Sequence, residues 1–188
     1  MSQKTKSPLG SLHYNRVHNK EEHKSMIDYR ITNEQDIDPV MEIRLEMLRE
    51  VNDLSEQYKY PDSFVSVSRE YFLHGDQTTI LALSKGKPIG CASICYIKIM
   101  PTFSHPAGRR AHLMNVYTSK DYRRQGIAEK MVQILINDAR QRGATEISLD
   151  TTQAGRLFYR SLGFADSEEC MVMTLDPLNT GGDKAPLG

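Results

Sequence analysis

The chain has 188 residues, of which 39% are hydrophobic and 26% charged, and this size and balance predict one globular domain with a substantial core. The formal net charge is zero, so the basic excess needed for general nucleic-acid binding is missing. No apolar run approaches the ~18 residues of a membrane span, and the polar N-terminus has no signal-peptide core. We therefore expect neither a nucleic acid nor a membrane as a partner.

The two ends of the chain differ from its middle in composition. Residues 1–25 are rich in His, Lys, Asn and Ser and show no hydrophobic periodicity, which predicts a flexible N-terminal tail. Residues 177–188 are predicted to form a flexible C-terminal tail for the same reason. The folded domain is expected to span residues 26–176.

Hydrophobic periodicity divides this domain into strands and helices. In chain order we expect a strand at 27–31, a helix at about 36–52, a less regular helix at 63–74, strands at 78–84 and 87–99, a loop at 100–108, a strand at 111–118, a helix at 127–142, a strand at 146–150, a helix at about 153–162, and final strands from 164 to 175. Thr32 or Asn33 can cap the first helix, and the turn Lys85-Gly86-Lys87-Pro88 indicates a hairpin.

The order of these elements predicts the fold class. Strands joined by short turns pair in antiparallel fashion, whereas the helix at 127–142 requires a parallel crossover between the strands on either side of it. The expected fold is therefore α/β, with a mixed, mostly antiparallel sheet, one parallel strand pair, and helices on both faces.

The most informative segment is Asp121-Tyr122-Arg123-Arg124-Gln125-Gly126-Ile127-Ala128, at a strand-to-helix junction. The positive end of a helix dipole favours anions, yet two arginines stand at this helix start and no acid follows them before Glu129. Gly126 lets the backbone approach a ligand closely, and first-turn amides are free to donate. By itself, an Arg-Arg pair at such a junction is more often a solvent-exposed turn than a binding site. The flanking strands instead favour a phosphate site within a βαβ unit.

Two motifs resemble those of the GNAT superfamily of N-acetyltransferases. Arg123, Gly126 and Ala128 match motif A, and Tyr159, which stands five residues before Phe164 of a Gly-Phe pair, matches motif B. The resemblance covers about residues 26–175. It departs from the family pattern where Thr152 replaces a frequent Asn and where Lys120 replaces a frequent Pro.

The resemblance implies a GNAT-like fold and acetyl-CoA as cosubstrate. Two parallel strands would splay apart, and the thioester would lie beside Asn115, Val116 and Tyr117. The pantetheine arm would pair with the strand at 114–118. The expected cofactor-binding residues are Val116, Tyr117, Thr118, Arg123, Arg124, Gln125, Gly126, Ile127, Ala128 and Thr152.

Acyl transfer from a thioester needs an oxyanion donor and a proton for the departing thiolate. A backbone amide left unpaired by the splay, that of Val116 or Tyr117, is the expected oxyanion donor. Tyr159 is the expected general acid, as the resemblance implies, although a tyrosine on an apolar helix face is otherwise most often a core residue. A phenol donating to a thiolate works uphill by roughly 2 kcal/mol, so this transfer needs assistance.

The acceptor side of the site is less defined by the sequence. Glu42, Glu46 and Glu50 stand four apart and thus on one helix face, where they could attract a cationic substrate; Glu42 and Glu46 are the expected substrate contacts. The competing interpretation is a solvated acidic face interleaved with arginines. His105 and His112 are alternative bases.

Three cysteines cannot all pair within the chain. Cys91 and Cys95 stand four apart in a strand-like run, which places both on one face, and we interpret them as buried free thiols. The six histidines show no ligand spacing, so no metal is expected. Free thiols fit a reducing cytoplasm, the expected location.

The sequence thus predicts an N-acetyltransferase that moves acetyl from acetyl-CoA to a primary amine by direct attack in a ternary complex. Neither motif contains a cysteine, so no acetyl-enzyme is needed. The alternative is a non-catalytic acyl-CoA-binding module that senses the cofactor or regulates a partner. The acceptor, a small molecule or a peptide, is left open, as is a homodimer.

Overall fold

The computed structural model describes residues 27–167 and 170–175, so the expected tails at 1–25 and 177–188 lie outside the described residues. The described residues form both helices and strands. In chain order they are β1 (Ile27–Ile31), η1 (Glu34–Asp36), α1 (Ile37–Val51), α2 (Asp62–His74), β2 (Gln77–Ser84), β3 (Lys87–Lys98), β4 (Arg109–Thr118), η2 (Lys120–Tyr122), α3 (Ile127–Gln141), β5 (Ile147–Leu149) and α4 (Arg156–Ser161). The predicted helices and strands as far as β5 are confirmed close to their expected bounds.

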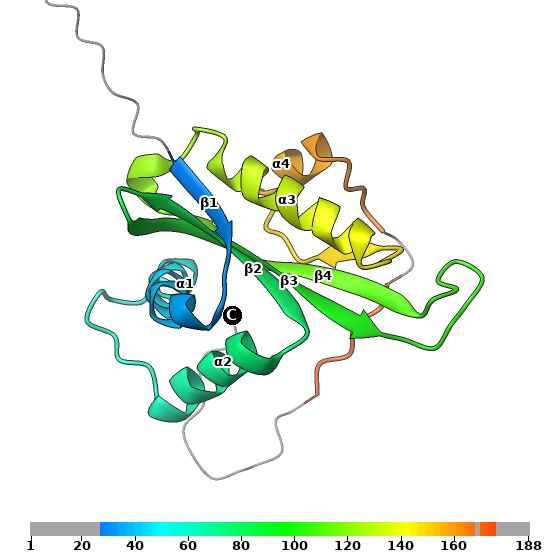
Figure 1. Ribbon diagram of the computed structural model, residues 1–188, viewed down its shortest axis with the longest axis horizontal. Helices are drawn as coiled ribbons and strands as arrows, with labels where there is room; N and C mark the ends of the chain where they lie inside the picture. The colour runs from blue at the N-terminus through cyan, green and yellow to red at the C-terminus, as the bar shows by residue number, and fades with distance from the viewer. Residues whose placement is uncertain (1–26, 168–169, 176–188) are drawn as a thin grey trace, which may run out of the picture.

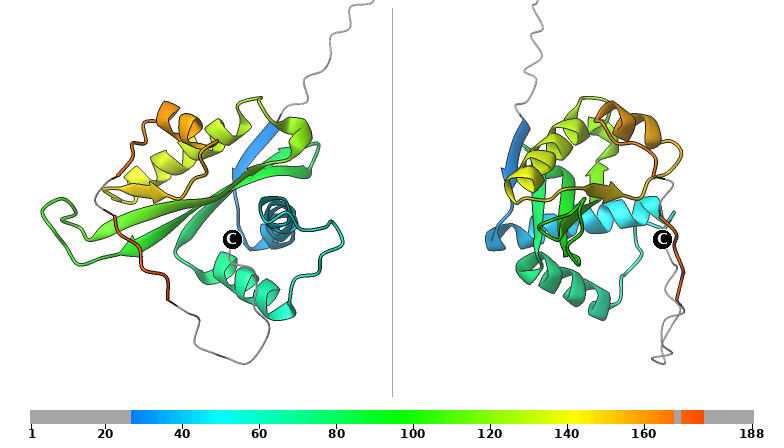
Figure 2. Two further views of the ribbon diagram at one scale, coloured as in Figure 1. Left: turned by 180° about the vertical axis from the view of Figure 1, so that it is seen from behind. Right: turned by 90° about the vertical axis from the view of Figure 1, so that its right-hand side faces the viewer.

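One five-stranded sheet organises the molecule, in the order β1-β2-β3-β4-β5. The first four strands pair in antiparallel fashion with their neighbours, and β4 pairs with β5 in parallel. Helices α1 and α2 cover one face of the sheet, and α3 and α4 lie on the other (Figures 1 and 2). The predicted mixed sheet with one parallel pair is confirmed.

The larger core lies between the sheet and α3. The predicted 3.6-residue apolar stripe of α3 is buried, with Met131, Val132 and Leu135 fully enclosed against Ile80, Ala92 and other residues of the sheet. Burying each such large apolar side chain contributes about 1.5–3 kcal/mol. The core therefore fixes the start of α3 relative to β4, which is where the site is built.

A smaller core packs α1 on the opposite face. Val40, Ile43 and Met47 of α1 contact Leu81, Leu83, Cys91 and Tyr117 of the sheet. The chain enters α1 through η1, where the Asn33 side chain accepts from the Gln35 amide and Asp36 accepts from the Asn33 amide. Asn33 is thus the cap, because the Thr32 amide instead continues the sheet by donating to Thr79.

The structure corrects the prediction for the C-terminal end of the domain. The final strands expected at 164–175 are wrong for the described part of that segment, since residues 164–167 and 170–175 form no strand. A strand needs a partner edge, and Met171, Val172, Met173 and Leu175 are instead largely exposed. Helix α4 is also shorter than expected, because Gln153, Ala154 and Gly155 form a turn ahead of it.

None of the helices in the described segments is at once long and apolar enough to cross a membrane.

Candidate active site at the splayed strands

Strands β4 and β5 separate after three residue pairs. Their register runs from Ala111↔Ile147 to Leu113↔Leu149, and β4 then continues to Thr118 without β5 beside it. The outer edge of β4 from Met114 to Thr118 is therefore unpaired among the described residues. Backbone groups on this edge can pair with an extended ligand as an added strand.

A β-bulge at Asn115 marks the point where the strands part. Ser93 pairs with Met114 and Cys91 pairs with Tyr117, so two β4 residues, Asn115 and Val116, stand opposite one residue of β3. Asn115 has φ +57°, a left-handed conformation that asparagine tolerates better than most residues. Its side chain is buried and hydrogen-bonded, with Nη1 of Arg44 3.0 Å from Oδ1 and Ser93 Oγ 3.2 Å from Nδ2.

The bulge determines which amides face the open edge. The Ser119 amide donates to the carbonyl of Ile89 in β3. Along an antiparallel strand, every second amide points toward the same neighbouring strand. The Tyr117 amide therefore faces β3, while the Val116 and Thr118 amides face away from it, toward the splay. Of the two expected oxyanion donors, this arrangement favours Val116.

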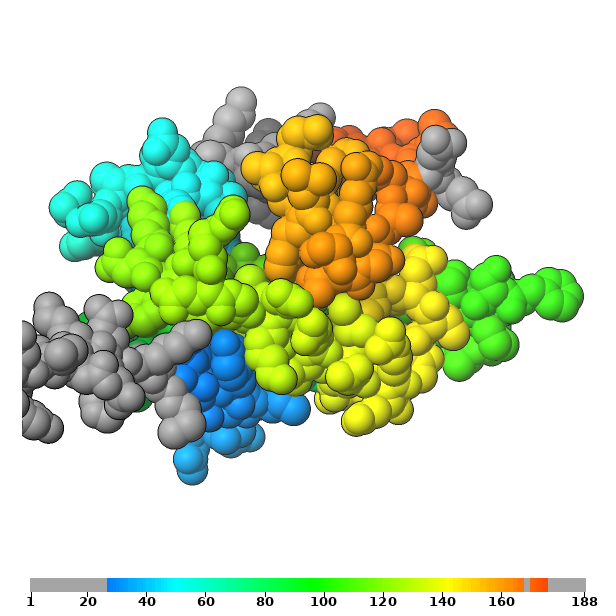
Figure 3. All heavy atoms as spheres, turned by 90° about the horizontal axis from the view of Figure 1, so that it is seen from above, coloured from blue at the N-terminus to red at the C-terminus, as the bar shows by residue number. Residues whose placement is uncertain are grey.

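The loop ahead of α3 presents free amides beside this edge. Arg124 and Gly126 have φ of +63° and +78°, and α3 begins at Ile127 with no side-chain cap. Lys130 N donates to Gly126 O, so the amides of Ile127, Ala128 and Glu129 have no intrahelical acceptor. In Figure 3, a recess separates the residues of this loop from α4. Gln125, in the same loop, is exposed.

Arg123 has an acidic partner that the sequence did not reveal. Its Nη2 lies 2.6 Å from Glu50 Oε1, its Nε donates to the Thr118 carbonyl, and its guanidinium stacks on the Tyr117 ring. The negative partner that the local sequence lacks at this helix start is therefore supplied to Arg123 by α1. Arg124 is exposed and makes no ion pair with any described residue.

The three glutamates of α1 have different surroundings. Tyr117 Oη donates to Glu46 (3.0 Å) and to Glu50 (2.9 Å), and Ser119 Oγ also donates to Glu46, at 2.8 Å. Burial, followed by these hydrogen bonds to the two carboxylates, raises the pKa of Tyr117, which keeps the phenol protonated. Glu42 is exposed. This face of α1 is therefore not a uniformly solvated acidic surface, since Glu46 and Glu50 are hydrogen-bonded to Tyr117 near the end of β4.

Tyr159 lies on the α3 side of the sheet. Its ring packs on Phe158 and Phe164, and both Tyr159 and Val116 contact the larger core. Burial raises the pKa of Tyr159, and its hydroxyl makes no hydrogen bond to any described residue. Thr152 lies in the turn before α4, where its carbonyl accepts from the Gly155 amide at 3.1 Å.

The two histidines proposed as bases both contact the β5 side of the site. His112 Nδ1 lies 2.9 Å from Ser148 Oγ, and His105 Nδ1 lies 2.7 Å from Thr145 Oγ1. The described cysteines are free, as expected, and Cys91 is buried, which raises its pKa to about 12. The expected burial is wrong for Cys95, which is half-buried, and Cys170 is exposed. In the described ranges, no three His, Cys, Asp or Glu side chains converge as metal ligands.

A pocket of about 420 Å³ adjoins the bulge on the other face of the sheet. It lies between α2 and the strands, and Arg44 from α1 and Asn115 both line it, together with Phe64, Val67, Ser68, Tyr71, Phe72, Gln77, Ser93, Cys95 and Met114. Neither Glu42 nor Glu46 is among its lining residues. Sequence reasoning missed Arg44, which the helical spacing had placed among solvated charges.

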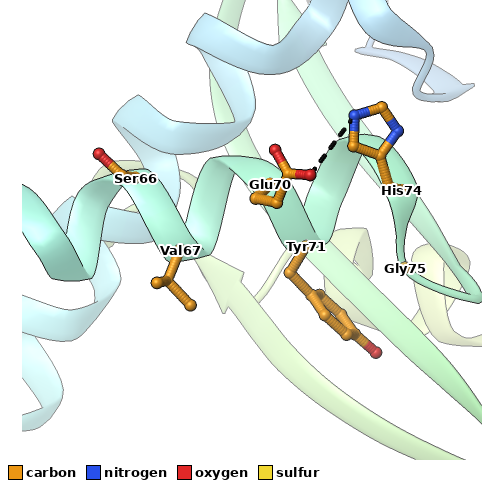
Figure 4. A pocket seen from close by; sticks show the side chains of 6 residues that line it. All are labelled: Ser66, Val67, Glu70, Tyr71, His74 and Gly75. Carbon is orange, nitrogen blue, oxygen red and sulfur yellow. Dashed lines mark ion pairs between the residues drawn. The ribbon is translucent and has the colours of Figure 1, made fainter.

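A second hollow of about 570 Å³ runs along the outside of α2. Figure 4 shows Val67 and Tyr71 projecting from one side of the helix, away from the Glu70–His74 ion pair. Because one helix and the residue after it supply its whole lining, we regard it as a surface groove and place the chemistry at the first pocket.

Comparisons with known proteins agree with this geometry. The sequence model of the acetyltransferase (GNAT) family matches residues 45–164. The glucosamine 6-phosphate N-acetyltransferase of Trypanosoma brucei brucei is 28% identical over 90 residues, which are 48% of this chain and 59% of that relative. N-alpha-acetyltransferase 30 of Schizosaccharomyces pombe is 36% identical over 117 residues, 60% of this chain and 70% of the relative.

Solved structures share the fold. A predicted acetyltransferase from Clostridium acetobutylicum, solved with acetyl-CoA, has a TM-score of 0.69 at 26% identity, over 79% of this chain and 96% of that one. These matches confirm the resemblance drawn from the two sequence motifs and the expected fold.

Proposed function

Because the chain belongs to the acetyltransferase (GNAT) family, we propose that it transfers the acetyl group of acetyl-CoA to a primary amine, which attacks directly within a ternary complex. The observation that carries this proposal is the unpaired edge of β4 from Met114 to Thr118, which lies beside the free first-turn amides of α3. The trypanosome and yeast relatives are named for amine acceptors, which supports a primary amine here.

The residues present fit acetyl-CoA. A pyrophosphate is an anion that the amides of Ile127 and Ala128 can bind, with Gln125 and Gly126 shaping the loop and Arg123 and Arg124 supplying positive charge. The Thr118 amide faces the splay and is suited to pair with an amide of the pantetheine arm. We assign a further polar contact with the cofactor to Thr152, which lies between β5 and α4.

Two groups of the chain act on the reacting atoms. The amine nitrogen forms a bond to the thioester carbonyl carbon, and the Val116 amide donates to the oxygen as it gains charge. The carbon–sulfur bond then breaks, and Tyr159 gives its proton to the departing sulfur. The nitrogen loses its extra proton to solvent. Tyr117, whose amide faces β3, supports this edge through its contacts with α1.

Burial bears on the role of Tyr159. Since the pKa of this phenol is raised, it remains protonated at neutral pH, but it is also a weaker acid than free tyrosine. The proton therefore moves as the carbon–sulfur bond breaks, and water can partly replace the donor.

The test is release of free thiol from acetyl-CoA in the presence of a panel of amines, with the products read by mass. We expect thiol release that depends on an added amine, and one amine that gains the mass of an acetyl group. Binding of acetyl-CoA with no release of free thiol in the presence of any amine would instead favour the non-catalytic acyl-CoA-binding module.

A further inference from the structure

Arg44 is a cation without a matching anion. It lies on α1 at the wall of the 420 Å³ pocket, where its Nη1 donates to Asn115 and its guanidinium lies 5.7 Å from the centre of the Phe72 ring. Its Nε is buried and has no hydrogen-bond partner among residues 27–167 and 170–175. Within the same residues it makes no ion pair, whereas Arg30, Arg69 and Arg123 each contact a carboxylate.

Such an arrangement is costly unless a ligand completes it. A buried N–H without an acceptor costs about 1–3 kcal/mol, and a charge removed from water costs more when no partner compensates it. Burial also lowers the pKa of Arg44, which shows the same penalty. An anion bound beside the guanidinium in the pocket would compensate the charge, whereas Nε itself is enclosed by protein atoms.

The position of Arg44 limits how far that anion lies from the reacting nitrogen. Arg44 is hydrogen-bonded to Asn115, and the next residue, Val116, carries the amide that faces the splay. A group held by Arg44 is therefore close in space to the acetyl-transfer point. The acceptor must carry its anion only a few bonds from its amine.

The remainder of the pocket is suited to an apolar group. Phe64, Val67, Tyr71 and Met114 line it and expose apolar surface, with 69% of Val67 and 43% of Met114 accessible. No aspartate or glutamate is among the lining residues, so nothing there favours a second cationic group. The volume accommodates a single small molecule rather than a large one.

We propose that the acceptor is a small α-amino acid with an apolar side chain, whose carboxylate pairs with Arg44 and whose side chain packs between α2 and β4. This inference rests on the proposed acetyl transfer and names its acceptor. It replaces the expectation that Glu42 and Glu46 attract the substrate, since neither residue lines this pocket.

The first test needs no variant of the protein. With acetyl-CoA as donor, kcat/KM is measured for leucine and phenylalanine and for leucinamide and phenylalaninamide, which lack only the carboxylate. We expect the amides to be about 10- to 100-fold poorer, the size of one charge-assisted interaction. The amine of an amino-acid amide is less basic and thus more often neutral, so amine protonation cannot produce this result.

The second test changes Arg44. Arg44→Gln should remove the preference for acid over amide, mainly through KM, while Arg44→Lys should retain part of it because the charge remains. Arg49→Gln is the matched control, since Arg49 lies on the same helix but stacks on Tyr60 outside the pocket. Melting curves show whether Arg44→Gln remains folded; if it does not, the comparison of acids with amides in the natural protein decides.

The outcomes separate the two proposals. Equal kcat/KM for acids and amides, or a clear preference for glucosamine 6-phosphate or for a peptide N-terminus, would overturn the amino-acid assignment but leave acetyl transfer standing. No thiol release with any amine would contradict the acetyl transfer itself.

Discussion

Arg123 and Glu50 form an ion pair, with 2.6 Å between Nη2 and Oε1, that joins the loop ahead of α3 to the last turn of α1. Burial would raise the pKa of Glu50, but hydrogen bonds from Arg123 and Tyr117 hold it below its usual range. Glu50 is therefore charged at neutral pH and offsets the charge of an arginine proposed to bind pyrophosphate. Glu50 and the pyrophosphate would therefore compete for the guanidinium of Arg123.

We expect Glu50→Gln to tighten CoA binding. Glutamine keeps an oxygen that can accept from Arg123, and the Thr118 carbonyl still holds Nε, so the guanidinium stays in place while one negative charge is removed. The dissociation constant should fall about 2- to 10-fold at low salt, as expected for one screened charge, and the gain should shrink as salt rises. Calorimetry at two salt concentrations measures this. Glu42→Gln, an exposed residue of the same helix, is the control; weaker binding by Glu50→Gln would show instead that Glu50 positions Arg123.

Gly126 offers a prediction with a close control at the other end of α3. Gly126 and Gly143 have φ of +78° and +75°, and a methyl group added to either would meet no atom within 4 Å. Alanine at either position should therefore cost a similar stability, about 1–2 kcal/mol. Only Gly126→Ala should weaken CoA binding, by tenfold or more, because its methyl group enters the space assigned to the pyrophosphate. Equal CoA affinity in the two variants would place the phosphates elsewhere.

Tyr159→Phe should keep CoA affinity and lower kcat by about 10- to 1000-fold, because it removes one phenolic proton and preserves ring packing on Phe158 and Phe164. Tyr29→Phe is the control, since Tyr29 packs against the same core from β1. The measurement is kcat with the identified amine together with the CoA dissociation constant. An unchanged kcat, with chemistry shown to limit the rate, would make Tyr159 a core residue only.

Asp138 of α3 provides a test of stability against pH. Burial would raise the pKa of this carboxylate, but hydrogen bonds from Thr78 (2.6 Å) and Tyr96 (2.5 Å), with nearby Arg142, hold it below its usual range. Such a group contributes stability above the ordinary carboxyl pKa of about 4, and the contribution is lost as the pH falls through the lower folded pKa. Asp138→Asn should lose about 1–3 kcal/mol near neutral pH, with a smaller deficit in acid.

Urea unfolding of both proteins near pH 7 and near pH 3 measures that change. Asp76→Asn is the control, because Asp76 is half exposed and pairs with Arg142 only at 3.5 Å. A deficit that is constant with pH would show that the ionisation of Asp138 does not contribute.

The elements and the cofactor loop were predictable because they depend on local sequence. The apolar stripe from Ile127 to Ala139 predicts a helix whatever it packs against. Gly126 indicates a turn, because glycine adopts a positive φ that most other residues avoid. The parallel strand pair followed from the helix between its members. These features needed no knowledge of distant contacts.

What could not be predicted depends on contacts between distant segments. The charge of Arg44 looks solvated until α2 covers it, and Glu50 meets Arg123 across 73 positions. Asn115 gave one local signal, since asparagine in a strand tolerates a positive φ, but the bulge itself appears only in the register with β3. The apolar residues 171–173 resemble a strand, yet the described segment has no partner edge.

The most direct test of the site is the effect of acetyl-CoA on thermal unfolding. A ligand that binds only the native protein, at one hundred times its dissociation constant, adds about 2.7 kcal/mol, which for a domain of this size raises the melting temperature by about 5–10 °C. We expect that shift for the natural protein and for Gly143→Ala, and at most about half of it for Gly126→Ala at the same concentration, because a tenfold weaker ligand adds only about 1.4 kcal/mol. A melting temperature that acetyl-CoA leaves unchanged in the natural protein would contradict the assignment of β4 and α3 as its binding site.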